Sequence, residues 1–124
     1  VRALAARTPR SLVVEEEALM RAFIRATLGR AGYRVLEAES AEDALGLARR
    51  HPGPIHLVIT NVQSPRIDGR ELAGALSAER PSLATIYASS STLSPLHVPP
   101  GAQWLRKPIA PDSLLATVKA ALAR

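Results

Sequence analysis

Three consecutive carboxylates, Glu15-Glu16-Glu17, are the most chemically distinctive feature of this sequence. Adjacent negative charges repel one another unless a cation, a lysine or water offsets them. A group of hard oxygen ligands of this kind is typical of a divalent-cation site, and a solvated acidic turn is the alternative interpretation. Cysteine is absent, which excludes a thiolate metal site and a cysteine nucleophile. The three histidines, His51, His56 and His97, are isolated and lack the spacing of metal ligands.

The glutamates follow a short apolar run, and similar runs recur along the chain. Short runs rich in apolar and β-branched residues are typical of buried strands, and the predicted strands are 11–14, 33–36, 55–60, 83–88 and 103–106. Apolar residues recur at helical spacing between them, and the predicted helices are 18–31, 40–50, 68–80 and 111–122. Ser40 and Asp68 stand where a side chain caps a first helical turn, and Pro111 suits such a turn.

Strands that alternate with helices must run parallel, because each helical crossover returns the chain to the same direction. The fold class is therefore predicted as α/β, a doubly wound five-stranded parallel sheet with helices on both faces. In such sheets ligands bind beyond the C-terminal ends of the strands. The polar residues at these ends are expected to converge at one rim, and they are Glu15–Glu17, Asn61, Ser89 and Lys107-Pro108.

Three segments at the predicted strand ends carry a family resemblance: Leu12–Glu17, Leu57–Val62 continued by Pro65–Gly69, and Trp104–Pro108. In order, spacing and placement they resemble the receiver domain of two-component response regulators, the CheY-like family. The resemblance covers residues 10–124 and leaves residues 1–9 as an N-terminal tail. It implies the strand order second, first, third, fourth, fifth, which is one of the orders known for doubly wound sheets.

The resemblance also implies a role for each polar residue at the rim. Glu15 and Glu16 correspond to the acid pair that holds Mg²⁺ in the family. Asn61 occupies the position of the aspartate that accepts a phosphoryl group from a histidine kinase. Ser89 and Lys107 correspond to the hydroxyl group and the cation that contact this phosphoryl group.

Two further features near Lys107 follow from the same resemblance. Trp104 corresponds to an aromatic residue that changes rotamer in the family, and its bulky indole favours a static anchor or interface residue here. The Lys107–Pro108 bond corresponds to a cis peptide that places the lysine. Three prolines between Ser89 and Lys107 predict that the fourth helix of the family is short or missing.

The residue at position 61 departs from the family in a way that changes the chemistry. A side-chain amide has no ionised oxygen to attack phosphorus, so Asn61 should not accept a phosphoryl group. Glu15 and Glu16 are longer and looser than the usual aspartates, whereas Mg²⁺ demands tight octahedral geometry. We therefore predict weak or absent Mg²⁺ binding and no cofactor. Lys107 is expected to pair with a glutamate, Glu16 being favoured, and to stabilise the rim without a metal.

These features predict a degenerate receiver domain that is not an enzyme and acts independently of phosphorylation, through protein contacts. The expected partners are a histidine kinase, a phosphotransfer protein, an attached output domain or a second copy of the chain. One alternative is a working receiver with another acceptor, such as Asp68 or Ser64. An alternative of another class is a basic nucleic-acid-binding adaptor, which the net charge of +5 would favour.

Composition sets the remaining expectations. The chain has 124 residues, of which 47% are hydrophobic, and this suits one compact domain. Its arginines are scattered and only 3% of its residues are aromatic, so we do not expect a nucleic-acid partner. No apolar run approaches the roughly 18 residues needed to span a bilayer, which predicts a soluble, cytoplasmic domain with no membrane partner.

Overall fold

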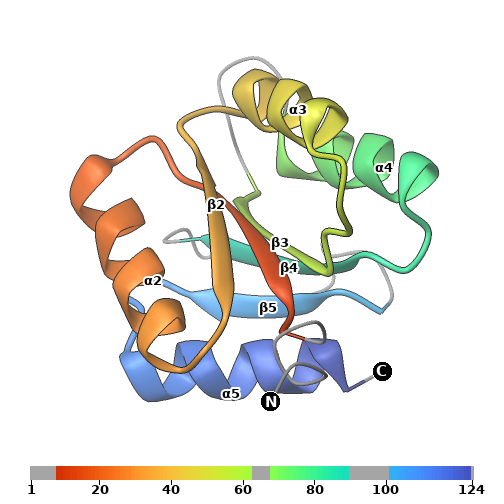
Figure 1. Ribbon diagram of the computed structural model, residues 1–124. Coiled ribbons are helices and arrows are strands. Elements are labelled where there is room, and N and C mark those ends of the chain that lie inside the picture. The colour runs from red at the N-terminus through yellow and green to blue at the C-terminus, as the bar shows by residue number, and fades with distance from the viewer. Residues whose placement is uncertain (1–7, 63–67, 90–100, 124) are drawn as a thin grey trace.

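The computed structural model describes residues 8–62, 68–89 and 101–123, which form a three-layer α/β sandwich (Figure 1). Its parallel sheet has five strands in the order β2-β1-β3-β4-β5, which confirms the predicted fold class and strand order. The strands are β1 (Arg10–Val14), β2 (Arg34–Ala38), β3 (Leu57–Asn61), β4 (Ala84–Ser89) and β5 (Gln103–Arg106). The described helices are α2 (Ala18–Arg30), α3 (Ala41–Arg50), α4 (Gly69–Glu79) and α5 (Pro111–Leu122).

The helices pack in two pairs, one on each face of the sheet. Helix α2 contacts α5 on one face, and α3 contacts α4 on the other (Figure 1). Successive residues of β1 serve opposite layers: Val13 joins the core under α2 and α5, whereas Leu12 and Val14 join the core under α3 and α4. Both faces of the central strands are therefore buried, which explains why their sequences are continuous apolar runs.

Capping side chains fix where two of the helices begin, as the sequence predicts. Ser40 Oγ accepts a hydrogen bond from the backbone N–H of Asp43 (3.1 Å). Asp68 Oδ1 accepts from the backbone N–H groups of Arg70 and Glu71 (both 2.9 Å). Each bond satisfies a donor for which the helix has no partner of its own. The caps thus start α3 and α4 soon after β2 and β3 end.

Strand β2 extends further than its sequence pattern indicates. The apolar run ends at Leu36, but the parallel register with β1 continues from the pair Leu12–Leu36 to the pair Val14–Ala38. Glu37 therefore lies within the strand although it is polar. Hydrogen bonding to the neighbouring strand carries β2 past the polar Glu37 to the buried Ala38.

The connection from β4 to β5 includes the segment for which a short or missing helix is predicted. Residues 90–100 lie outside the described residues, so this expectation stays a prediction. The described chain resumes at Gly101, whose φ of +88° is a conformation that glycine adopts at little cost. From there it enters β5, where Gln103 pairs with Ile86 of β4.

Candidate functional site

The C-terminal ends of β1, β3, β4 and β5 form one edge of the sheet, which we call the rim. The last paired positions of these strands are Val14–Thr60, Asn61–Ala88 and Ser89–Arg106. Glu15, Asn61, Ser89 and Lys107 are thereby placed on neighbouring chain segments at this edge. The rim thus brings together the four polar positions that the strand pattern predicted would converge.

An ion pair between Glu15 and Lys107 joins the ends of β1 and β5. Lys107 Nζ lies 2.8 Å from Glu15 Oε1, and the two side chains are 19% and 5% exposed. The second carboxylate oxygen, Oε2, accepts the backbone N–H of Glu17 (3.1 Å). A charge-assisted hydrogen bond with little surrounding water is stronger than an exposed one. The chain itself therefore engages both oxygens of the Glu15 carboxylate.

Lys107 pairs with Glu15 and not with Glu16, which corrects the sequence-based prediction. The backbone N–H of Glu15 donates to the carbonyl of Ala38 (3.0 Å), so Glu15 continues the path of β1 and its side chain is buried. Glu16 lies beyond this pairing and is exposed. Water solvates an exposed carboxylate, whereas a buried one needs a partner.

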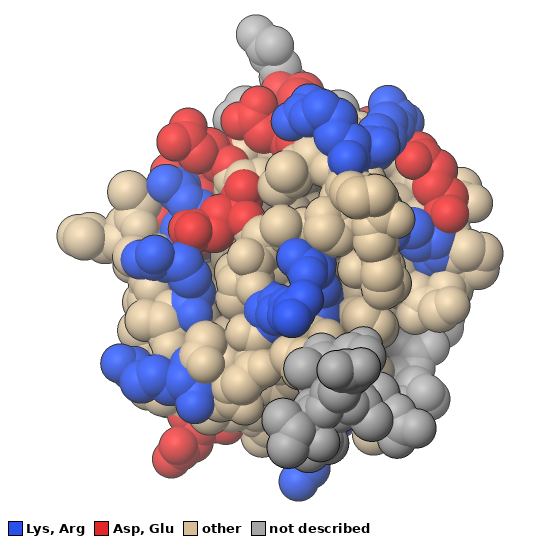
Figure 2. All heavy atoms as spheres, in the orientation of Figure 1, with Lys and Arg blue, Asp and Glu red and all other residues tan. Residues whose placement is uncertain are grey.

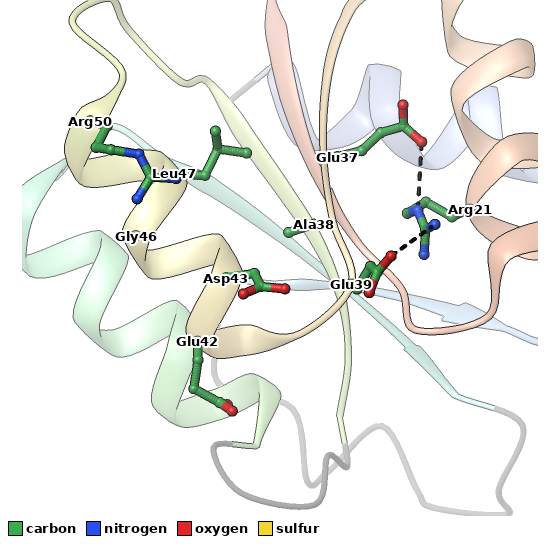
Figure 3. A pocket seen from close by; sticks show the side chains of 9 residues that line it. All are labelled: Arg21, Glu37, Ala38, Glu39, Glu42, Asp43, Gly46, Leu47 and Arg50. Carbon is green, nitrogen blue, oxygen red and sulfur yellow. Dashed lines mark ion pairs between the residues drawn. The ribbon is translucent and has the colours of Figure 1, made fainter.

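Arg21 is a second cation at the rim, which the sequence pattern did not predict. Its Nη1 donates to the backbone carbonyl of Glu15 (2.7 Å). Its guanidinium also forms ion pairs with Glu37 Oε1 (3.6 Å) and Glu39 Oε1 (3.7 Å), and Figure 3 marks both with dashed lines. The side chain is only 15% exposed. The one signal in the sequence was an arginine in the helix that follows the acidic run.

A groove of about 530 Å³ opens beside Arg21, between α3 and the end of β2 (Figure 3). The charged side chains of its walls are Arg21, Glu37, Glu39, Glu42, Asp43 and Arg50. Arg25 lies 3.7 Å from Glu37 Oε2, so arginines offset part of the acidic charge. The groove and the rim share Arg21, but their carboxylates have different cationic partners.

Asn61 stands at the tip of β3, and the start of α4 fixes its backbone. The N–H of Gly69 donates to the carbonyl of Val62 (2.9 Å). A Cβ atom on Gly69 would overlap the carbonyl oxygen of Asn61, so only glycine permits this close approach. Thr60 Oγ1 also donates to the Asn61 carbonyl (3.3 Å). The tip of β3 is therefore held beside the rim by backbone contacts.

Ser89 and Lys107 meet through their backbones where β4 and β5 end. The N–H of Lys107 donates to the carbonyl of Ser89 (2.9 Å), and Ser89 is buried, with 9% of its surface exposed. The Lys107–Pro108 peptide is cis, as the family resemblance implies. These contacts fix the backbone of Lys107 so that its side chain extends toward Glu15.

Trp104 lies half-buried on β5 opposite Tyr87 of β4. Both side chains belong to a small apolar cluster with Val62, Ala73 and Ala102. Tyr87 is almost fully buried, and this burial raises the pKa of its hydroxyl group above the usual value. The packing agrees with an anchoring role for Trp104, which stays a prediction. Tyr87 was not singled out from the sequence because it reads as an ordinary strand residue.

The described histidines lie away from the rim, at the N-terminal ends of the strands. His56 Nδ1 accepts the backbone N–H of Arg10 (2.9 Å). His51 Nε2 is buried and has no hydrogen-bond partner among the described residues. Burial, together with the charges of Arg10 and Arg80, lowers the pKa of His51. His97 falls outside the described residues.

The donor atoms at the rim do not fit the Mg²⁺ site that the family uses. Mg²⁺ takes oxygen ligands in a near-ideal octahedron and prefers ionised carboxylates. The Glu15 carboxylate is already bound by Lys107 and by the N–H of Glu17. Asn61 contributes no charge, and the Glu16 side chain is exposed. In the part of the chain that the structure describes, no three carboxylate or imidazole groups gather as a set of metal ligands.

Comparison with known proteins places this chain in a family. Residues 11–119 match the response regulator receiver domain. The chain is 29% identical over 119 residues to the probable transcriptional regulator ycf27 of Porphyridium aerugineum, a match that covers 91% of this chain and 48% of that protein. It is 31% identical over 112 residues to the sensor kinase CckA of Brucella abortus (strain 2308), covering 87% of this chain and 12% of that protein. The structure of the Vibrio cholerae chemotaxis protein CheY4 gives a TM-score of 0.83 at 26% identity, covering 93% of this chain and 99% of that chain.

The sheet order and the matches define the class of protein, a CheY-like domain of two-component signalling. The chain belongs to the response regulator receiver domain family. Domains of this family work with histidine kinases and output domains. The chain spans about half of the matched transcriptional regulator and a much smaller share of the sensor kinase. Within the described ranges, no helix combines the length and apolar character that crossing a membrane requires.

Proposed function

We propose that this receiver domain takes part in two-component signalling without phosphorylation at its rim, and that it acts through contacts with other proteins. The observation that carries the proposal is the identity of residue 61. Asn61 ends β3 next to the end of β1, which is followed by Glu15, the partner of Lys107, and it occupies the position where the family has its acceptor aspartate. The position is retained in the fold, while its reactive group is replaced by a neutral amide.

The chemistry of phosphoryl transfer supports the proposal that Asn61 accepts no phosphoryl group. The acceptor attacks phosphorus in line through an oxygen that carries negative charge. The carboxamide oxygen of Asn61 is neutral, and its nitrogen lone pair is delocalised into the carbonyl group. Neither atom is a competent nucleophile for this reaction, so Lys107 and Ser89 have no phosphoryl group to contact.

We also propose that the rim binds no Mg²⁺ at physiological concentration. When bound to a receiver, Mg²⁺ neutralises the charge of the incoming phosphoryl group, so a rim that accepts none does not require it. The support comes from the donor set, in which Lys107 and the N–H of Glu17 engage the buried carboxylate of Glu15. Calorimetric titration with MgCl₂ would contradict this proposal if it revealed a sub-millimolar site.

Asp68, the alternative acceptor within the described residues, is committed to a structural contact. Its Oδ1 caps α4, and its Oδ2 lies 3.5 Å from Arg70 Nη2. Both carboxylate oxygens are thus engaged at the start of α4, and transfer of a phosphoryl group would convert one of them into the bridging oxygen of an acyl phosphate. The other alternative, Ser64, falls outside the described residues.

The distribution of surface charge favours a protein partner over a nucleic acid. Figure 2 shows acidic and basic side chains interspersed over one face of the molecule. Several arginines on the described surface face carboxylates, for example Arg49, which donates twice to Glu79 Oε2 (3.2 and 3.0 Å). We propose a histidine kinase, a phosphotransfer protein, an attached output domain or a second copy of the chain as the partner.

Acetyl phosphate treatment followed by intact-mass measurement tests the proposal. The unmodified chain should gain no labile mass of about 80 Da in the presence of Mg²⁺. The matched variant is Asn61→Asp, which restores the carboxylate and should gain this mass. A mass gain on the unmodified chain that Asp68→Asn or Ser64→Ala abolishes would contradict the proposal. Salt-dependent retention on DNA would instead favour the nucleic-acid adaptor.

A further inference from the structure

We infer that Lys107 is the resident counter-ion of the rim, so that the buried charge is balanced within the chain and the rim assembles without a divalent cation. The inference deepens the proposed function and rests on it in one respect, because only a rim that accepts no phosphoryl group can dispense with the metal. The observation behind it is separate, namely the geometry of the Glu15–Lys107 pair.

Counting the charges of the buried Glu15–Lys107 contact gives a balance of zero. The Glu15 carboxylate, 5% exposed, contributes one negative charge, and the Lys107 ammonium, 19% exposed, contributes one positive charge. Asn61 is neutral, and the carboxylates of Glu16 and Glu17 are exposed to water. An aspartate at position 61 would leave one excess negative charge, which a bound divalent cation would offset.

The neighbouring arginines do not disturb this balance, because they have carboxylates of their own. Arg21 contacts Glu15 only through the backbone carbonyl, while its guanidinium lies near Glu37 and Glu39. Arg25 also faces Glu37. Two arginines therefore meet two glutamates beside the rim, and the Glu15 carboxylate is left to Lys107.

The pair is also preorganised, which keeps the cost of forming it low. The backbone of Glu15 is fixed by two hydrogen bonds: its N–H donates to the carbonyl of Ala38, and its carbonyl accepts from Arg21 Nη1. The backbone of Lys107 is fixed by the hydrogen bond that its N–H donates to the carbonyl of Ser89. A buried ion pair is favourable only when its geometry is good and the remaining hydrogen-bonding groups are satisfied. These backbone contacts meet that condition on both sides of the pair.

Variants that break the balance should make the rim respond to metal. Lys107→Met removes the positive charge, and Asn61→Asp adds a negative one, so both leave the same excess by different routes. The double variant Glu15→Gln/Lys107→Met returns the buried charge to zero. Metal-dependent stability should therefore appear in the two single variants and disappear again in the double variant.

Thermal unfolding with and without about 10 mM MgCl₂ or MnCl₂, against NaCl of equal ionic strength, tests the inference. The metal should raise the Tm of the unmodified chain by less than about 1 °C. It should raise the Tm of Lys107→Met and of Asn61→Asp by about 4–6 °C, as a Kd near 1 mM would give. The control is Lys119→Met, which removes the only other lysine of the chain, an exposed residue of α5. This control should behave as the unmodified chain does.

Three results would overturn the inference: metal stabilisation of the unmodified chain equal to that of the variants, a response of the double variant, or no response in either single variant.

If Lys107→Met does not fold, NMR of the Lys107 ammonium group in the unmodified chain provides the test. Its signal should be unaffected by Mg²⁺, and displacement at millimolar metal would contradict the inference. A phosphoryl group found at Asp68 would defeat the proposed function but leave this charge balance intact.

Discussion

The C-terminal and N-terminal ends of the strands each hold a cation, but the groups that bind it differ. At the rim, the ammonium of Lys107 meets the Glu15 carboxylate. At the opposite edge, the Arg80 guanidinium donates to three backbone carbonyls, those of Ala48 (2.8 Å), His51 (3.1 Å) and Gly53 (2.9 Å). Two of these carbonyls lie at the C-terminal end of α3, where the helix dipole favours a positive charge.

The contact of Lys107 is an ion pair, whereas the contacts of Arg80 are hydrogen bonds to uncharged backbone groups. Arg80 is held by uncharged groups, so its contribution depends on hydrogen bonding and should be insensitive to changes of charge elsewhere. Lys107 is held by a carboxylate, so its contribution depends on every charge that the rim contains, including the residue at position 61. A change of charge at the rim should therefore alter the contact of Lys107 and leave the contacts of Arg80 largely unchanged.

Substitution of Gly69 should lower the stability of the protein most, because it displaces the backbone at the rim and leaves the end that holds Arg80 unchanged. In Gly69→Ala the new Cβ would overlap the Asn61 carbonyl, and we expect a loss of more than about 3 kcal/mol in the free energy of unfolding. Gly74→Ala is the matched control, since open space surrounds Gly74 in α4. Urea unfolding should show this control to be stabilised by about 0.5–1 kcal/mol. Equal stabilities for both variants would contradict the close approach.

A salt series should sharpen the contrast between the two cations. Arg80→Met should cost about 2–4 kcal/mol in the free energy of unfolding, because three carbonyls lose their donor, and this cost should change little between low and high salt. Lys107→Met should cost less, and its cost should decrease at about 1 M NaCl, where charge interactions are screened. Arg34→Met, at an exposed residue of β2, is the control. A cost for Arg80→Met that decreases with salt as steeply as the cost for Lys107→Met would remove the distinction.

The smallest expected effect is a pH dependence at the edge that holds Arg80. Burial lowers the pKa of His51 below its ordinary value of 6.5, so at lower pH the unfolded chain binds more protons than the folded one. The stability that the neutral form of His51 contributes should therefore be fully present above pH 6.5. It should be lost as the pH falls toward the lowered pKa of His51. His51→Gln should lessen this loss in urea unfolding between pH 7.5 and 5.5 (roughly one unit either side of the ordinary pKa). An unchanged slope would show that His51 does not titrate in this range.

Much of the fold could be predicted because its signals are local. The apolar runs of the strands, the caps at Ser40 and Asp68 and the alternation of elements are all written in short segments. They sufficed for the parallel sheet and for the convergence of the strand ends. The end of β2 could not be predicted in the same way, because its last residues are set by pairing with β1.

The rim was predicted in outline but not in its contacts. Arg21 and Gly69 were missed because their importance lies in what they approach, the carbonyls of Glu15 and Asn61. The choice between Glu15 and Glu16 as the partner of Lys107 depends on which carboxylate is buried. Three identical side chains in a row offer no local signal for that choice.

The sequence by itself determined the chemistry available at position 61, because a neutral amide is neutral in any fold. It also determined the layered architecture, through periodic hydrophobic patterns that need no distant information. Only the tertiary structure decided how the charges are balanced, because Glu15 and Lys107 are 92 positions apart and meet only when β1 and β5 end at the same edge. Burial and distance set the strength of that pair, and both are properties of the folded chain alone.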